Sequence, residues 1–108
     1  MIHQTINDVL FSRFQMLIDL IPIGKKDAVS MTALAKLTGL SSPDVRQMVL
    51  NARTEGLLVC SCDEGYYFPK NEGELTDYIR RRRKYIRTAQ IALQPFENTL
   101  TDQKEGDP

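Results

Sequence analysis

The chain has 108 residues with 14 basic and 14 acidic side chains, so its formal net charge is zero at pH 7. This length favours one small domain, and 42% hydrophobic with 26% charged residues is typical of a soluble globular protein. No apolar run approaches the roughly 18 residues of a membrane span, and the N-terminus lacks the pattern of a secretory signal, so we expect a cytoplasmic protein.

The first predicted helix covers residues 5–21, and Pro22 and Gly24 end it. Its apolar residues recur at three- and four-residue spacing, as in a helix with one buried stripe. They are Ile6, Leu10, Phe14, Leu17, Ile18 and Ile21.

A very short strand is predicted at residues 28–30, followed by a second helix for which Ser30 or Thr32 is a suitable N-cap. Gly39 should end this helix as a left-handed C-cap. We expect Leu34, Ala35 and Leu37 to point inward.

A third helix is predicted from Pro43 to about Glu55, with Ser42 as N-cap. Asp44 lies in its first turn, where the helix dipole favours a negative charge. Its apolar side consists of Val45, Met48, Val49 and Ala52.

A β-hairpin should follow, with strands at residues 57–62 and 66–70 and an Asp-Glu-Gly turn between them. Pro69 suits the end of an edge strand. Core packing beneath the hairpin is the expected role of Tyr66, Tyr67 and Phe68.

A last helix is predicted over residues 72–94, with Pro95 ending it. Its apolar residues Leu75, Ile79, Ile86, Ala89 and Leu93 follow three- and four-residue spacing, and Arg82 fills the one gap. Residues 96–108 are polar and acidic, which predicts a disordered tail.

Two helices joined by a Gly-containing turn, followed at once by a hairpin, are typical of a winged helix-turn-helix. The predicted fold is therefore mainly α with a small hairpin and a long C-terminal helix. A winged-helix domain would occupy residues 1–95, with the helix-turn-helix at 31–55 and the wing at 57–70.

The second helix of such a motif enters the major groove of DNA, where side chains on its exposed face read base edges. Arginine can fork to guanine, and glutamine or asparagine to adenine. These rules select Arg46, Gln47 and Asn51 as base-reading residues. Leu50 on the same face is suited to a thymine methyl group.

Phosphate contacts are assigned to the polar and basic residues around that helix and on the last helix. They are Thr32, Lys36, Ser42, Arg53, Arg80, Arg81, Arg83, Lys84 and Arg87. Residues 1–70 carry seven basic and seven acidic side chains, whereas residues 71–95 carry six basic and three acidic. The alternative for the basic run is a solvated helix face, with Asp77 pairing to Arg81.

Residues 21–87 resemble small winged-helix proteins of phages and prophages of Gram-positive bacteria. The matching motifs are I-P-x-G-K, A-V-S before the second helix, L-x-G-L-S, V-R, E-G-L-L-V-C-S, G-Y-Y-F-P and the Arg-rich last helix. The resemblance implies binding of double-stranded DNA, and repression, excision and replication control are all compatible with it.

One departure from a DNA-contacting wing favours a second interpretation. The tip carries Asp63 and Glu64, where a wing that touches phosphate usually carries lysine or arginine. The rival function is a protein-interaction adaptor on the same fold. The stripe of the last helix either packs on the first helix or pairs with a second copy as a homodimer.

Enzymatic chemistry is not expected, because the sequence has no Gly-rich phosphate loop and no Cys/His or Ser/His pair. Cys60 and Cys62 are too closely spaced for a redox motif and too few for a zinc site. We therefore expect no metal, no cofactor and no small-molecule substrate.

Overall fold

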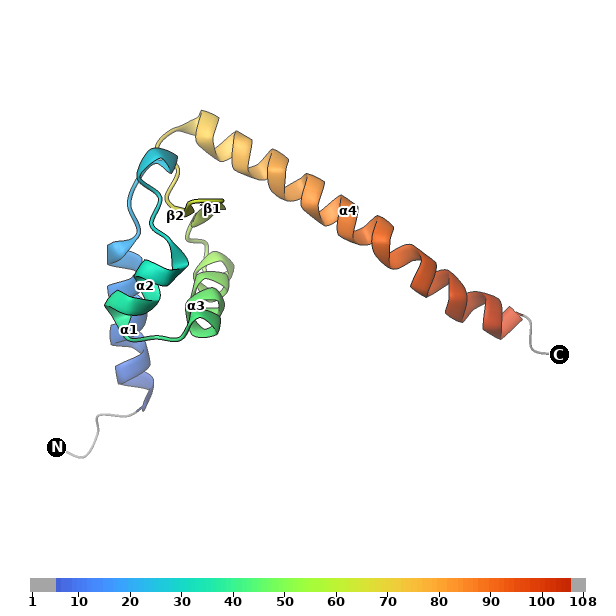
Figure 1. Ribbon diagram of the computed structural model, residues 1–108, viewed down its shortest axis with the longest axis horizontal. Coiled ribbons are helices and arrows are strands. Elements are labelled where there is room, and N and C mark those ends of the chain that lie inside the picture. The colour runs from blue at the N-terminus through green and yellow to red at the C-terminus, as the bar shows by residue number, and fades with distance from the viewer. Residues whose placement is uncertain (1–5, 106–108) are drawn as a thin grey trace. The chain divides into compact units, whose positions relative to one another are not determined.

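A computed structural model describes residues 6–105, with side chains over residues 12–101. The chain divides into two compact units, an N-terminal unit (Met1–Leu75) and a C-terminal unit (Thr76–Pro108). The helices and strands, labelled in Figure 1, are α1 (Ile6–Leu20), α2 (Met31–Thr38), α3 (Ser42–Thr54), β1 (Cys60–Cys62), β2 (Gly65–Tyr67) and α4 (Glu72–Glu105). A 3-10 turn, η1 (Lys25–Asp27), lies between α1 and α2. The expected mainly α fold, with one small hairpin and a long C-terminal helix, is confirmed.

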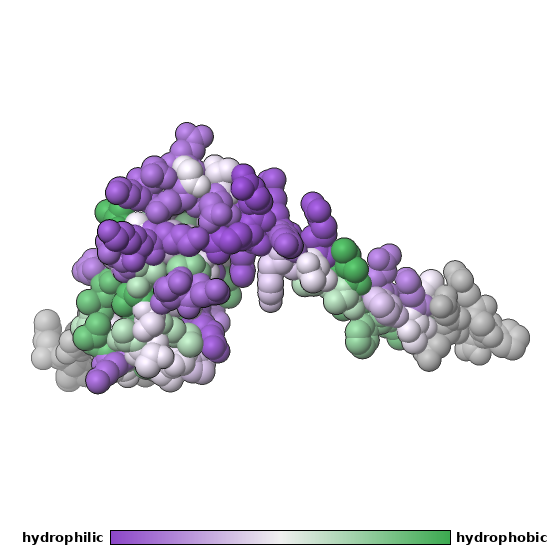
Figure 2. Space-filling view, turned by 45° about the horizontal axis from the view of Figure 1, so that its top comes forward, coloured by the Kyte–Doolittle hydropathy of each residue, from purple (hydrophilic) through white to green (hydrophobic). Residues whose placement is uncertain are grey.

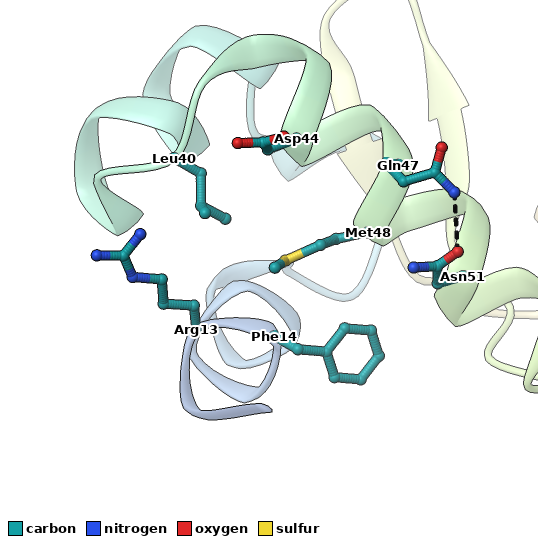
Figure 3. Close-up of a pocket in the computed structure, with 7 residues that line it drawn as sticks. All are labelled: Arg13, Phe14, Leu40, Asp44, Gln47, Met48 and Asn51. Atoms are coloured by element: carbon teal, nitrogen blue, oxygen red, sulfur yellow. Dashed lines mark hydrogen bonds between the residues drawn. The ribbon is translucent and has the colours of Figure 1, made fainter. Parts of the chain in front are cut away.

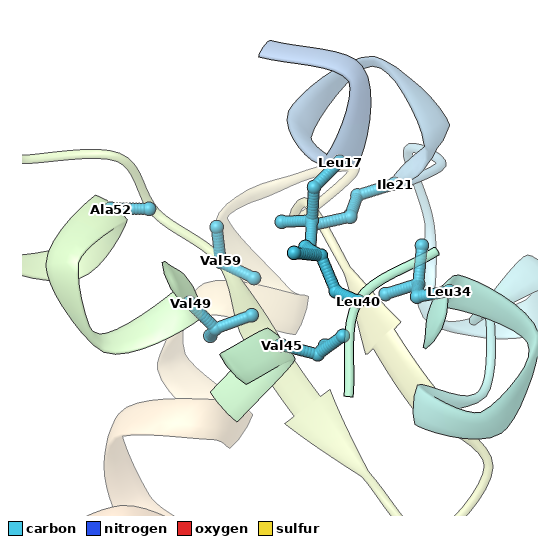
Figure 4. Close-up of a cluster of buried hydrophobic side chains, with 8 residues drawn as sticks. All are labelled: Leu17, Ile21, Leu34, Leu40, Val45, Val49, Ala52 and Val59. Carbon is cyan, nitrogen blue, oxygen red and sulfur yellow. The ribbon is translucent and has the colours of Figure 1, made fainter. Parts of the chain in front are cut away.

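The core of the N-terminal unit forms where α1, α2 and α3 meet the chain that leads into β1 (Figure 4). The buried side chains are Leu17, Ile21, Leu34, Leu40, Val45, Val49, Ala52 and Val59. Burying an aliphatic side chain of this size contributes roughly 1.5–3 kcal/mol to folding. This core fixes α3 against α2 and so determines which side of α3 faces solvent.

The inward face of α2 differs from the prediction at one position. Leu37 is 60% exposed, and Thr38 is buried instead. The Thr38 hydroxyl donates to the carbonyl of Leu34 at 2.6 Å and accepts from the N–H of Leu40 at 3.3 Å. Because the core lies toward Thr38, four residues after Leu34, Leu37 falls on the solvent side.

Serine side chains cap the N-termini of both α2 and α3. The Ser30 hydroxyl accepts from the N–H of Ala33 at 3.1 Å, which confirms Ser30 as the cap of α2. The predicted cap of α3 is off by one residue, since Ser41 accepts from the N–H of Asp44 at 3.3 Å and Ser42 is the first helical residue. Adjacent serines offer the same capping chemistry, so the sequence does not distinguish them.

Gly39 adopts the left-handed conformation expected of a C-cap, with φ of 74°. This conformation ends α2 and turns the chain within three residues into α3. The short turn is consistent with the predicted pair of adjacent helices.

The hairpin strands are shorter than predicted. β1 and β2 pair antiparallel, with Cys60 opposite Tyr67 and Cys62 opposite Gly65. The strand expected at residues 28–30 is reduced to one antiparallel bridge between Val29 and Tyr66, with N···O distances of 2.9 and 2.8 Å. A sheet this small is stabilised by packing on the helices rather than by its own ladder.

The aromatic residues of the hairpin pack inward, as predicted. Tyr67 is completely buried, and Tyr66 and Phe68 pack against the core while partly exposed. They are therefore core residues rather than a surface for stacking bases.

Helix α4 does not end at Pro95, so the prediction of a helix over 72–94 with a disordered tail is wrong for residues 96–105. Residues 106–108 lie outside the described part. A proline inside a helix removes one N–H bond and costs about 3 kcal/mol. Here the helix around Pro95 is exposed, so water can hydrate the carbonyl of Ile91 that loses its partner.

The first turn of α4 belongs to the N-terminal unit and is hydrogen-bonded within it. The carboxylate of Glu74 accepts from the backbone N–H of Lys25 at 3.2 Å and from that of Lys70 at 2.9 Å. Asn71 caps the same turn by accepting from the N–H of Glu74 at 2.9 Å. These bonds hold the loop after β2 against η1.

Candidate nucleic-acid interface

The predicted base-reading residues share one exposed face of α3. Val45, Val49 and Ala52 bury the opposite face in the core. At 100° per residue, positions 46, 47, 50, 51 and 54 then form a continuous outward surface, and all five are exposed. We call the set Arg46, Gln47, Leu50, Asn51 and Thr54 the α3 face.

Two amide side chains of the α3 face are joined to each other. The Gln47 Nε2 donates to the Asn51 Oδ1 at 2.9 Å (Figure 3). The bond uses one donor and one acceptor, so each amide retains groups for a further hydrogen bond. The pair therefore presents oriented donors and acceptors, which is the chemistry that recognises an adenine edge.

Arg46 supplies the positive charge of the α3 face. Within residues 12–101, no carboxylate forms an ion pair with its guanidinium. Leu50, one turn further on, is 51% exposed. An unpaired guanidinium beside an exposed leucine can address both a guanine edge and a thymine methyl group.

The predicted phosphate-binding residues of α2 and α3 differ in their environments. Thr32 and Lys36 are exposed on α2, and Ser42 is partly exposed at the start of α3. These three side chains can therefore contact a phosphate without any change in the fold.

Arg53 is not available for phosphate in the way predicted. Its Nε donates to the carbonyl of Val59 at 2.8 Å, and its guanidinium also donates to the Ser61 hydroxyl at 3.3 Å. The side chain is partly buried between the end of α3 and β1. We therefore assign Arg53 to holding the hairpin against α3.

Replacing Arg53 with methionine keeps the aliphatic stem but removes both hydrogen bonds. We expect the free energy of unfolding to fall by about 1.5–3 kcal/mol, as for hydrogen bonds to a charged group, with DNA affinity little changed. Urea denaturation measures the first quantity. Arg46→Met is the matched control on the same helix and should change stability by no more than about 0.5 kcal/mol. Equal losses in the two variants would contradict the structural role of Arg53.

A groove of about 450 Å³ lies between α1 and the side of α3. Its lining residues are Arg13, Phe14, Leu40, Asp44, Gln47, Met48 and Asn51 (Figure 3). Phe14, Leu40 and Met48 make its apolar floor, and Arg13 and Asp44 stand at its rim. Sequence reasoning missed this groove, because Phe14 and Met48 belong to stripes that were expected to be fully buried.

The tip of the hairpin is negatively charged. Asp63 and Glu64 are both exposed there. The pKa of Glu64 lies below its usual value, mainly because the Cys62 side chain hydrogen-bonds to the carboxylate. Glu64 is therefore ionised at neutral pH, and this tip repels phosphate.

The basic residues at 80–87 of α4 belong to the C-terminal unit and are exposed. Those predicted to contact phosphate are Arg80, Arg81, Arg83, Lys84 and Arg87. The predicted ion pair between Asp77 and Arg81 is present at 3.0 Å, with both side chains 40% exposed. In the described part of the chain no carboxylate pairs with Arg80, Arg83, Lys84 or Arg87. These four charges are available to an anionic partner.

Among the described residues, the cysteines and carboxylates form no metal-binding cluster. Cys60 is a buried free thiol and Cys62 a partly exposed one. Among the residues described, no three His, Cys, Asp or Glu side chains lie close enough to hold a metal ion. None of the helices within residues 6–105 combines the length and the apolar character needed to cross a membrane.

No protein-family model, curated protein or solved structure matches this chain. The resemblance to phage-type winged-helix proteins therefore remains a prediction from sequence motifs.

Proposed function

We propose that this protein binds double-stranded DNA through a winged helix-turn-helix formed by α2, α3 and the β1–β2 hairpin. The observation that carries the proposal is the α3 face, where Arg46, Gln47 and Asn51 point away from the core on one rigid helix. Packing against α2 supports α3 from behind. A helix held in this way can enter the major groove with its outer face toward the bases.

Each residue of the α3 face has a role in this mechanism. Arg46 forks to guanine, and the amides of Gln47 and Asn51 read adenine. Thr32, Lys36 and Ser42 hold phosphates beside the groove, and Arg80, Arg81, Arg83, Lys84 and Arg87 add contacts that carry no sequence information. The acidic hairpin tip at Asp63 and Glu64 stays away from the phosphate backbone of the DNA.

The process served would be phage-like regulation of transcription or control of replication in the cytoplasm. The sequence resemblance supports this choice of process. The absence of a net positive charge is compatible with it, because the basic side chains are concentrated locally rather than spread over the chain.

Salt dependence of binding tests the proposal directly. Fluorescence anisotropy with a random-sequence duplex should show affinity falling by about 10³-fold between roughly 50 and 200 mM salt, because phosphate contacts release counterions. The same titration with an uncharged analogue of the duplex backbone is the control. Absence of binding at the lowest salt concentration would refute the proposal.

A protein-interaction adaptor is the second candidate. The acidic tip and the zero net charge favour it, and so does the groove with its apolar floor of Phe14, Leu40 and Met48. An apolar cleft with charged rims is typical of surfaces that receive a partner helix. If the groove receives a protein, the Phe14→Ala variant should lose partner binding while its affinity for DNA stays unchanged.

A further inference from the structure

Helix α4 carries an apolar stripe whose large side chains are exposed in the C-terminal unit. Because the helix continues past Pro95, the stripe extends beyond Leu93 to two further residues. It consists of Ile79, Arg82, Ile86, Ala89, Leu93, Phe96 and Leu100, which we call the α4 stripe. Its large apolar side chains are between 43% and 72% exposed, and Figure 2 shows green hydrophobic residues among the hydrophilic ones along this helix.

The spacing of the α4 stripe is that of a coiled coil. Successive members lie three, four, three, four, three and four residues apart, which is a seven-residue repeat without interruption. Two helices with such a seam wind around each other and bury it. A stripe on a straight helix of a single protein would instead drift with a period of 3.6 residues. The period therefore favours a second helix with the same repeat, and a second copy of α4 provides one.

The charges next to the seam select the orientation of the two helices. Arg83, Gln90 and Glu97 form one flank of the α4 stripe, because each directly follows a stripe residue: Arg82, Ala89 and Phe96. In an antiparallel pair this flank faces the same flank of the other helix. A two-fold axis near Gln90 then brings Arg83 against the partner's Glu97, and Glu97 against the partner's Arg83. These are the only charges on that flank among the side chains of the C-terminal unit that the structure describes.

A parallel pair is disfavoured by the same residues. It would place Arg82 of the seam directly against the partner's Arg82, with two guanidinium groups in a mostly apolar interface. Arg83 would face Tyr78 of the partner rather than a carboxylate. No other pairing offers Arg83 an opposite charge within the described part of the helix.

The antiparallel register also gives complementary seam layers. Ile86 meets the partner's Phe96, and the small Ala89 meets the partner's Leu93, so the two layers nearest the axis pair a small side chain with a large one. Arg82 falls near the end of the interface, against the partner's Leu100. Its guanidinium already lies over the Tyr85 ring at 5.0 Å, turned toward the edge of the seam. Its charged end can therefore stay in water while its stem covers apolar surface.

We propose that α4 forms an antiparallel homodimer, centred near Gln90 and fixed in register by two Arg83–Glu97 ion pairs between the copies. In the dimer Arg83 pairs with the partner's Glu97 instead of phosphate. Arg80, Lys84 and Arg87 stay exposed on the outward side, so the dimer joins two basic surfaces. This inference rests on α4 alone and does not depend on the proposed binding of DNA.

A charge-exchange experiment on the full-length chain tests the register. Arg83→Glu and Glu97→Arg are measured singly and together by sedimentation equilibrium without DNA. Each single change replaces two attractions with two repulsions, so we expect the dimer dissociation constant to rise by about tenfold or more. The double variant restores both pairs in reversed polarity and should return to within about threefold of the original constant.

Lys84→Glu is the matched control, because it reverses a charge on the outward side and should leave the constant unchanged within about threefold. Leu93→Asp should abolish the dimer. A monomeric original chain, or a double variant no better than its single parents, overturns the proposal. An original chain that dimerises but binds no DNA would refute the proposed function and leave this inference standing.

Discussion

The Arg46→Glu variant is expected to bind a DNA duplex about 100-fold more weakly than the original chain. A forked arginine contact contributes roughly 1–3 kcal/mol, and the introduced carboxylate repels the phosphates beside it. Arg46 is exposed on α3 and takes no part in the core. Its replacement should therefore leave the free energy of unfolding within about 0.5 kcal/mol of the original value. Anisotropy at low salt measures the affinity, and urea denaturation checks the fold.

Lys26→Glu is the control for this experiment. Lys26 is an exposed cation on η1, so the substitution changes the net charge equally but lies on a different element from the α3 face. We expect its affinity to stay within about threefold of the original, because a charge remote from the contact acts only through screened attraction. Equal losses from both variants would mean that binding is diffuse and that α3 reads no bases. No loss from either would favour the adaptor function.

The Gly65→Ala variant is expected to lose about 3 kcal/mol of stability, as for a buried overpacking that the backbone cannot relieve. Gly65 has φ of 141°, a conformation that L side chains rarely adopt. A Cβ there would overlap the carbonyl carbon and oxygen of Val29 and stand 2.7 Å from the N–H nitrogen of Ser30. Backbone atoms would have to move, which breaks the bridge between Val29 and Tyr66 and disturbs the cap of α2.

Urea denaturation should show this loss as a lower midpoint with an unchanged slope. Gly39→Ala is the matched control, since Gly39 has φ of 74° but nothing within 4 Å of the added Cβ. It should lose only about 1–2 kcal/mol, the cost of the left-handed conformation itself. The difference between the two variants isolates the contact with residues 29 and 30. A Gly65→Ala variant as stable as Gly39→Ala would contradict the close packing of the hairpin.

Local sequence signals predicted the helices well. Apolar spacing located α1, α2 and α3, and Gly39 marked the turn between the last two. These features are set by interactions between residues three or four apart in the chain, so they are legible without any tertiary information. The prediction failed at Pro95, where a strong local signal for a helix end was overridden. The surrounding helix is exposed, and an exposed carbonyl without its helical partner is hydrated at modest cost.

The sequence predicted the exposure of the α3 face, but not the environment of Arg53. The outward direction of Arg46, Gln47 and Asn51 follows from the period of α3 once Val45 and Val49 are taken as buried. Arg53 was misassigned because its partners, Val59 and Ser61, belong to the hairpin. Residue types do not show which side chain will donate to a backbone carbonyl elsewhere in the chain. The spacing of residues in α3 therefore could not distinguish Arg53 from a solvent-exposed arginine.

The sequence by itself determined the elements with strong local periods, the face of α3 that turns outward, and the apolar spacing of α4 as far as Leu93. Only the tertiary structure decided that Thr38 rather than Leu37 is buried, that Val29 bridges Tyr66, and that α1 and α3 enclose a groove. The physical reason is range. Helical faces and caps depend on residues within one or two turns of the same helix. The burial of a side chain and the pairing of backbone segments depend on which distant parts of the chain pack against it.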